Sequence, residues 1–157
     1  VYATHKKNTT HIINNEVKKI LEKEIEFGIK DISTYTNFQN KIIKVKKQLL
    51  DFVDNAKKEK KKIVCYGAAA KGNTLLNYCN IGLDYIDYVV DRSSYKQGLY
   101  LPGTHIPIKN PDEIKRTKPD YVLILPWNLQ EEISNQMNFI KEWDGKFVIP
   151  IPEVKIQ

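Results

Sequence analysis

The second half of the chain contains five apolar runs of strand length, and their pattern limits the possible folds. The runs consist mostly of Val, Ile, Leu and Tyr in continuous order, at 63–66, 86–90, 106–108, 121–125 and 147–151. Strands of this kind are buried on both faces, which requires helices above and below a parallel sheet. Helical patterns lie between most of the runs. The sequence therefore predicts a small α/β domain, a Rossmann-like parallel sheet with helices on both faces.

A helical segment is expected before this domain. Residues 14–30 follow an Asn cap and repeat apolar side chains at helical spacing. A longer helix is predicted from a cap at Ser33 or Thr34, because one apolar face recurs at steps of three and four, at Phe38, Ile42, Val45, Leu49, Phe52 and Ala56. We accordingly divide the chain into a residual strand of a further domain at 1–11, a helical linker at 12–59 and the Rossmann-like domain at 60–157.

Helix-start signals also mark the second half of the chain. Asn110 precedes Pro111 and two acids, and this order is typical of a helix N-terminus. Asn128 stands three residues before Glu131 and is expected to cap a helix reaching about residue 143. A further helix is predicted at 73–80. Helices thus follow the first, third and fourth apolar runs.

Size and charge exclude several classes of protein. The 157 residues provide one ordinary domain with a helical appendage, and the first residue, Val1, indicates a piece of a longer protein. The net charge of +6 comes largely from lysines gathered at 57–62, where a helix ends, so we expect no nucleic acid as partner. Apolar runs are too short for a membrane span. Cys65, Cys79 and the histidines lack metal-ligand spacing, which favours reduced thiols in the cytoplasm and no metal.

The carboxyl ends of the predicted strands carry the candidate binding residues. Ligands of open parallel sheets bind beyond these ends. The first run leads into the loop 67–72, with Asn73 following. The second run ends at Asp91 and Arg92, with Lys96 nearby, and the fourth run leads to Trp127 and Asn128. These side chains are predicted to meet at one edge of the sheet.

The glycine loop allows several interpretations. Gly67 and Gly72 have the spacing of a phosphate-binding NTPase loop, but Asn73 replaces the lysine that such a loop needs. A dinucleotide fingerprint would use the same outer glycines, but in this chain Ala69 replaces its middle glycine. Asp91 lies where such a fingerprint expects a ribose-binding acid. A more general anion site would use backbone N–H groups at the helix start and the charge of Lys71. Alternatively, the small residues only let helix and strand pack closely.

Three longer motifs carry a family resemblance. The stretches YGAAAKGNTLLNYC, DYVVDRSSYKQGLYLPGTHIPI and PDYVLILPWN occur in order, with consistent spacing, over about residues 60–153. They resemble the C-terminal domain of S-adenosylmethionine-dependent sugar C-methyltransferases, which methylate carbon 3 of dTDP-4-keto-6-deoxysugars or similar nucleotide sugars. The resemblance implies an enzyme with a zinc-binding module, a central methyl-donor domain and this domain, with the nucleotide sugar between the last two.

The resemblance also implies roles for individual residues. The residues that match the loop facing the diphosphate are Gly67, Ala69, Lys71, Gly72 and Asn73. Asp91 and Arg92 match the end of the second strand and would contact ribose, base or sugar, and Lys96 would contact phosphate or base. The turn at 102–105, including His105, is interpreted as structural. The resemblance places no catalytic residue, methyl-donor loop or zinc ligand in this chain, so S-adenosylmethionine would bind elsewhere and the isolated chain would be inactive.

Two other functions remain open at this stage. An NAD-dependent sugar reductase or dehydrogenase fragment would use the same loop, although the tyrosines at 78, 85, 88 and 95 lack a lysine four residues later. A non-catalytic docking domain would use the long helical face to recruit another protein. The methyltransferase interpretation requires a nucleotide-sugar substrate and the methyltransferase core of the same polypeptide as partners.

Overall fold

The computed structural model describes residues 5–7 and 14–157, and the chain divides into two units, residues 1–41 and 42–157. The first unit contains α1 (Glu16–Glu26), α2 (Ile32–Thr36) and the first turn of α3 (Phe38–Lys58). The apolar face of α1 is exposed, with Val17, Ile20, Leu21 and Ile25 each more than half accessible to solvent. The strand predicted within 1–11 falls almost entirely outside the described residues.

The single long helix predicted from Ser33 or Thr34 is wrong in its starting point. The structure has two helices that meet at Asn37, and the residue preceding α2 is Asp31. The Thr36 hydroxyl donates to the Ser33 carbonyl at 3.1 Å, and the Asn37 amide donates to the same oxygen. The Thr36 hydroxyl thus shares the Ser33 carbonyl with the helical bond from Asn37 at the point where α2 ends. The apolar repeat therefore gave Leu49 and Ala56 of the buried face of α3 correctly, but Phe38 is 57% exposed and the predicted start is wrong.

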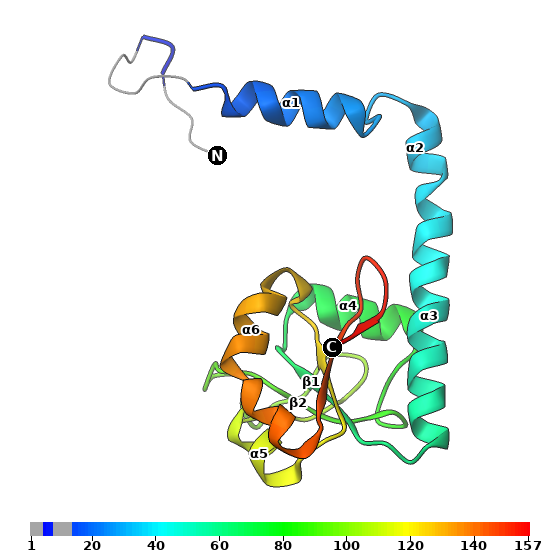
Figure 1. The fold of residues 1–157 in the computed structure, drawn as a ribbon, viewed down its shortest axis with the longest axis vertical. Coiled ribbons are helices and arrows are strands. Elements are labelled where there is room, and N and C mark those ends of the chain that lie inside the picture. The colour runs from blue at the N-terminus through cyan, green and yellow to red at the C-terminus, as the bar shows by residue number, and fades with distance from the viewer. Residues whose placement is uncertain (1–4, 8–13) are drawn as a thin grey trace. The chain divides into compact units, whose positions relative to one another are not determined.

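The second unit is built on a six-stranded sheet (Figure 1). Its strands follow the chain as β1 (Ile63–Tyr66), β2 (Ile86–Val90), β3 (Ile108–Lys109), β4 (Tyr121–Ile124), β5 (Lys146–Ile149) and β6 (Lys155–Ile156). In space the order is β3-β2-β1-β4-β5-β6, and the first five strands are parallel. This is the strand order of a doubly wound dinucleotide-binding fold. The predicted α/β class and Rossmann-like sheet are confirmed.

Two strand details differ from the prediction. The short strand β6 pairs antiparallel with β5 and was not predicted, because both of its residues are exposed and it carries no apolar run. The run predicted at 106–108 contributes only its last residue to β3. Pro107 instead bridges to Tyr100, and the Leu101 amide donates to the Ile106 carbonyl. A local chain reversal thus uses the backbone that a longer strand would need.

Both faces of the sheet are covered by helices. On one face Leu123 of β4 packs in a cluster with Leu49 of α3 and Leu76 of α4 (Ala70–Cys79). On the other face its neighbours Val122 and Ile124 pack under α5 (Asp112–Thr117), α6 (Gln130–Gln136) and the 3₁₀ helix η2 (Asn138–Trp143). Figure 1 shows α3 and α4 on one side of the strands and α5 and α6 on the other. This double burial confirms what the continuous apolar runs predicted.

The two cysteines belong to this core. Cys65 on β1 and Cys79 on α4 are free and buried. Burial raises the pKa of both thiols, since a thiolate is poorly stabilised among apolar side chains. Within the described ranges, no helix combines the length and apolarity needed to cross a membrane.

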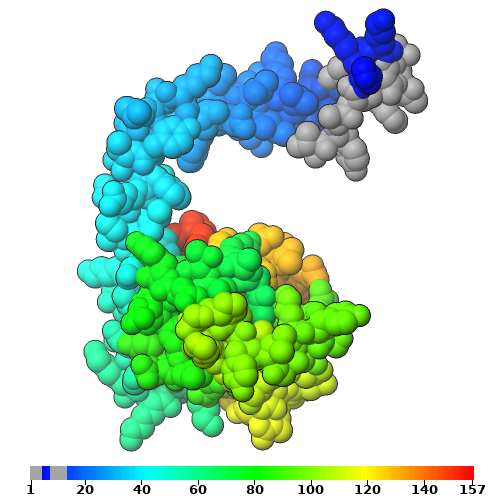
Figure 2. All heavy atoms as spheres, turned by 180° about the vertical axis from the view of Figure 1, so that it is seen from behind, coloured from blue at the N-terminus to red at the C-terminus, as the bar shows by residue number. Residues whose placement is uncertain are grey.

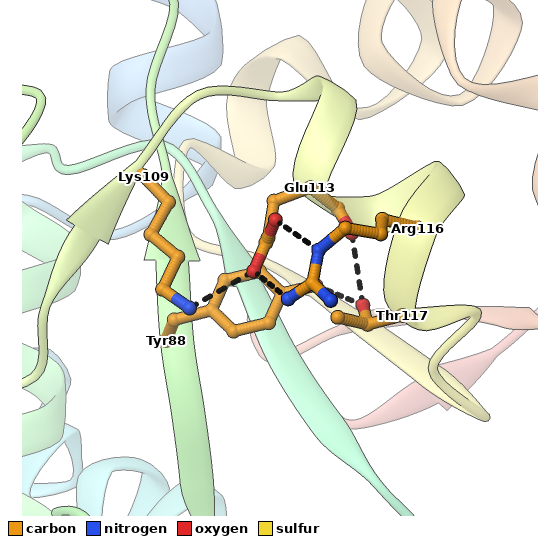
Figure 3. Close-up of polar contacts among 5 residues, drawn as sticks. All are labelled: Tyr88, Lys109, Glu113, Arg116 and Thr117. Carbon is orange, nitrogen blue, oxygen red and sulfur yellow. Dashed lines mark hydrogen bonds and ion pairs between the residues drawn. The ribbon is translucent and has the colours of Figure 1, made fainter.

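An ion-pair cluster fixes α5 against the sheet (Figure 3). Glu113 accepts hydrogen bonds from Arg116, at 2.8 and 2.7 Å, and from Lys109 of β3 at 3.0 Å. Thr117 donates to the Glu113 carbonyl and contacts the hydroxyl of Tyr88. The bonds from Arg116 and then from Lys109 lower the pKa of Glu113 from 4.5 to about 2. The ionised Glu113 side chain is therefore more stable in the folded state than in the unfolded chain, and it stabilises the fold.

This cluster predicts a pH dependence of stability. Because the folded-state pKa is depressed, the contribution of Glu113 is complete above pH 4.5 and is lost as the pH falls towards 2. We expect Glu113→Gln to lower the free energy of unfolding by about 1 kcal/mol at neutral pH, since both basic partners are partly solvated. The difference from the unmodified protein should shrink in urea titrations repeated at decreasing pH. Asp112→Asn, at an exposed neighbouring acid, is the control, and an equal pH effect there would contradict the assignment.

Candidate functional site

The glycine loop packs tightly against the end of β4. Gly67 follows β1 with a φ of +90°, and a Cβ added there would lie 2.6 Å from the ring of Pro126. A Cβ added to Gly72 would lie 2.5 Å from the Cβ of Leu125. Both distances are far below a normal carbon–carbon contact, so only glycine fits at these two positions. The close-packing interpretation of the small residues therefore holds for Gly67 and Gly72.

Backbone donors remain available at the same place. The amide of Gly67 donates to the Val90 carbonyl at 2.7 Å, and the amide of Ala69 donates to the Gly67 carbonyl at 2.9 Å. For the amides of residues 70–72, the described part of the chain supplies no acceptor, and α4 has no side-chain cap there. The first N–H groups of a helix carry partial positive charge and bind anions. This end of α4 is therefore suited to an anionic group.

Lys71 joins the start of α4 to the end of β4. Its ammonium donates to the Asn128 side-chain oxygen and lies 4.4 Å from the centroid of the Trp127 ring. The prediction that Asn128 caps a helix is wrong. It lies within the 3₁₀ helix η1 (Trp127–Leu129), and α6 starts only at Gln130. The Asn128 side chain, predicted to cap the helix, instead accepts a hydrogen bond from Lys71. The ammonium of Lys71 therefore lies where the neighbouring strands β1 and β4 end.

Asp91 lies on the other side of the glycine loop. Its Oδ2 accepts the Ala68 amide at 2.8 Å and the Lys96 ammonium at 3.2 Å, and its Oδ1 accepts the Ser93 amide at 2.8 Å. Burial alone would raise the pKa of Asp91, but the bonds from Ser93, Lys96 and Ala68 outweigh it and lower the pKa. The acid predicted to contact a ligand thus holds the loop that precedes α4.

The remaining candidates lie at the rim of this edge. Arg92 reaches Glu132 of α6 at 3.5 Å, and both side chains are more than half exposed. Asn73 accepts a hydrogen bond from Asn77 at 3.3 Å. Figure 2 shows one face of the second unit, where α4 and the segment after β2 appear in green to yellow-green. The structure thus places the glycine loop, Asp91 with Lys96, and Trp127 with Asn128 around one end of the sheet.

One structural residue was missed by sequence reasoning. Asn77 donates to the carbonyls of Pro102 at 3.0 Å and Asn73 at 2.9 Å. The Asn77 side chain also packs so closely against Gly103 that a Cβ there would collide with it. Asn77 of α4 therefore holds the turn that ends at His105. The only available signal was its spacing of four residues from Asn73, which is common in helices. Asn77 therefore supports the structural interpretation of the turn.

Comparison with known proteins assigns the family. The family model described as C-methyltransferase C-terminal domain matches residues 1–152. The C-methyltransferase NovU of Streptomyces niveus is 34% identical over 146 residues, which cover 93% of this chain and 35% of NovU. The chain thus spans about a third of the length of this curated relative. Among solved structures, UDP-D-quinovosamine 4-dehydrogenase from Vibrio fischeri is 19% identical with a TM-score of 0.47, covering 62% of this chain and 93% of that chain. That similarity is too low to bear on function. Since the family model spans nearly the whole chain, the protein belongs to the C-methyltransferase C-terminal domain family.

Proposed function

We propose that this chain binds the diphosphate of a nucleotide sugar and positions the sugar for methyl transfer by another domain of the same polypeptide. The substrate we propose is a dTDP-4-keto-6-deoxysugar or a similar nucleotide sugar. The observation that carries the proposal is the run of three unpaired N–H groups at residues 70–72, within the described chain, beside the ammonium of Lys71. A diphosphate is an anion that both kinds of donor favour.

The location of these donors supports the proposal. They lie at the carboxyl ends of β1 and β4, where the strand order changes direction. Open α/β sheets bind ligands in the crevice at this switch point. Membership of a C-methyltransferase family is consistent with a substrate in which a carbon atom accepts a methyl group. The contribution of this domain would be alignment, because transfer between two bound groups depends strongly on their relative position.

We propose that S-adenosylmethionine, the methyl donor, binds outside this chain. The N–H groups of the loop and the ammonium of Lys71 do not suit the positive sulfonium of this donor. The carboxylate of Asp91, which could otherwise hold the donor's ribose, already accepts three hydrogen bonds from the chain. Under this proposal the isolated chain has no methyltransferase activity.

Titration with dTDP tests the proposal directly. We expect dTDP to shift the amide NMR signals of residues 70–72 and to raise the melting temperature. Lys71→Met should weaken dTDP binding about tenfold, the effect of losing one hydrogen bond to a charged group. Lys115→Met removes an equal charge from an exposed i,i+3 pair on α5 and should leave binding unchanged.

Other outcomes of this titration would contradict the proposal. If millimolar dTDP changed neither the amide NMR signals nor the melting temperature, the proposed diphosphate site would be contradicted. Tighter binding of NAD(H) than of dTDP would favour a reductase or dehydrogenase fragment. Association with the methyltransferase core that is indifferent to nucleotide sugars would favour a docking domain.

A further inference from the structure

The chain itself uses most of the accepting capacity of the Asp91 carboxylate. A carboxylate offers about four acceptor positions, two on each oxygen. The Ala68 amide and the Lys96 ammonium both bond to Oδ2, at 2.8 and 3.2 Å, and the Ser93 amide bonds to Oδ1 at 2.8 Å. The Asp91 side chain is only 15% exposed. Little of its accepting capacity remains for a ligand.

An acid at this position has a different task in dinucleotide-binding domains. At the end of the second strand it accepts hydrogen bonds from ribose hydroxyls and so favours a ribonucleotide. The present sheet has the same strand order, and Asp91 directly follows β2. In this chain the Lys96 ammonium already uses one of the acceptor positions of Asp91.

Lys96 is held in this place by further contacts. Its ammonium also donates to the Ala68 carbonyl at 3.0 Å, so it joins the glycine loop to Asp91. The next residue, Gln97, donates from its side chain to the Asp91 carbonyl at 2.9 Å. The Gly98 amide donates to the Ile108 carbonyl at 2.9 Å. Residues 96–98 are therefore held by contacts to Ala68, Asp91 and Ile108.

We infer that Lys96 removes the preference for a ribonucleotide by using an acceptor position of Asp91, so that the site gains little from a ribose 2′-hydroxyl and accepts a deoxyribonucleotide equally well. This inference rests on the proposed function, because it concerns the nucleoside of the same ligand. It assigns Asp91 and Lys96 as positioning residues that hold the loop before α4. A dTDP-sugar, which lacks the 2′-hydroxyl, is the class of substrate that such a site suits.

The test compares two ligands that differ in one hydroxyl, dTDP and ribothymidine diphosphate. In the 157-residue chain we expect similar dissociation constants for the two. Lys96→Met should free an acceptor position on Asp91 and shift the ratio of dissociation constants about tenfold towards the ribonucleotide, as expected for one hydrogen bond to a charged acceptor. Lys96→Arg, which keeps a charged donor, should retain the original ratio. Lys155→Met removes a lysine charge from the short pair with Glu153 and serves as the control.

A second variant identifies the acceptor. Adding Asp91→Ala to Lys96→Met should return the ratio of the two dissociation constants towards one, because the carboxylate that distinguishes the two ligands is gone. This holds even if the substitution weakens the binding of both ligands. Binding of both ligands with a ratio that Lys96→Met leaves unchanged would overturn this inference and leave the proposed function standing. A preference of the unmodified chain for the ribonucleotide would also overturn it. Failure of both ligands to bind at millimolar concentration would overturn the proposed function, and this inference with it.

Discussion

Gly67→Ala is expected to lower the free energy of unfolding by about 3 kcal/mol and to weaken dTDP binding at the neighbouring loop. Two effects add at this position. The φ of +90° is unfavourable for any residue with a Cβ, and the new Cβ would lie 2.6 Å from the Cδ and Cγ of Pro126. Proline is a rigid neighbour that cannot swing away, so the loop or the end of β4 would have to move. Urea denaturation of the purified variant measures the loss.

Gly98→Ala separates the two effects. Gly98 has a φ of +83°, close to that of Gly67, but an added Cβ would meet nothing within 4 Å. Only the cost of a positive φ for a residue with a Cβ remains, and we expect Gly98→Ala to lower the free energy of unfolding by about 1 kcal/mol. Equal losses for the two variants would show that close packing against Pro126 is not what requires glycine at position 67.

Phe147→Ala is expected to lower the free energy of unfolding by about 4 kcal/mol. Phe147 on β5 is 2% exposed and is among the largest fully buried side chains. It packs between the sheet and the helices α5 and α6, in the cluster that contains Ile114 and Ile133. Truncation removes a ring from a dense layer and leaves a cavity, because strands held by a hydrogen-bonded sheet cannot close the gap. The loss is again measured by urea denaturation.

Phe38→Ala provides a control of the same chemical type. Phe38 begins α3 and is 57% exposed, so its truncation should change the free energy of unfolding by less than about 0.5 kcal/mol. A loss at position 147 as small as that at position 38 would contradict burial of the second face of the sheet.

Much of the fold could be predicted from the sequence, because burial on both faces leaves a local signature. The runs at β1 and β2 match the observed strands residue for residue. The Asn110 side chain accepts the Asp112 amide at 2.9 Å and supports the start of α5, as the cap pattern predicted. By contrast, β6 was missed, since an exposed strand of two residues has no apolar pattern, and its partner β5 supplies the register.

The candidate site could be predicted only in part. Its residues could be assigned to one edge, because carboxyl ends of parallel strands share an edge. Their use as ligand contacts stays a prediction. Asn128 shows why sequence reasoning was limited, since its cap pattern is correct locally but its side chain accepts a bond from Lys71, 57 residues earlier in the chain. No local pattern contains such a contact.

The sequence by itself determined which segments are buried, and from that the class of fold and the edge at which a ligand would bind. Tertiary structure alone decided what each polar group at that edge does. It placed Pro126 against Gly67 and Leu125 against Gly72. It also made the Asp91 carboxylate the acceptor of hydrogen bonds from Ala68, Ser93 and Lys96. The physical reason is that burial follows from the periodicity of neighbouring residues, whereas hydrogen-bond partners are chosen among groups that the strand order brings together from distant parts of the chain.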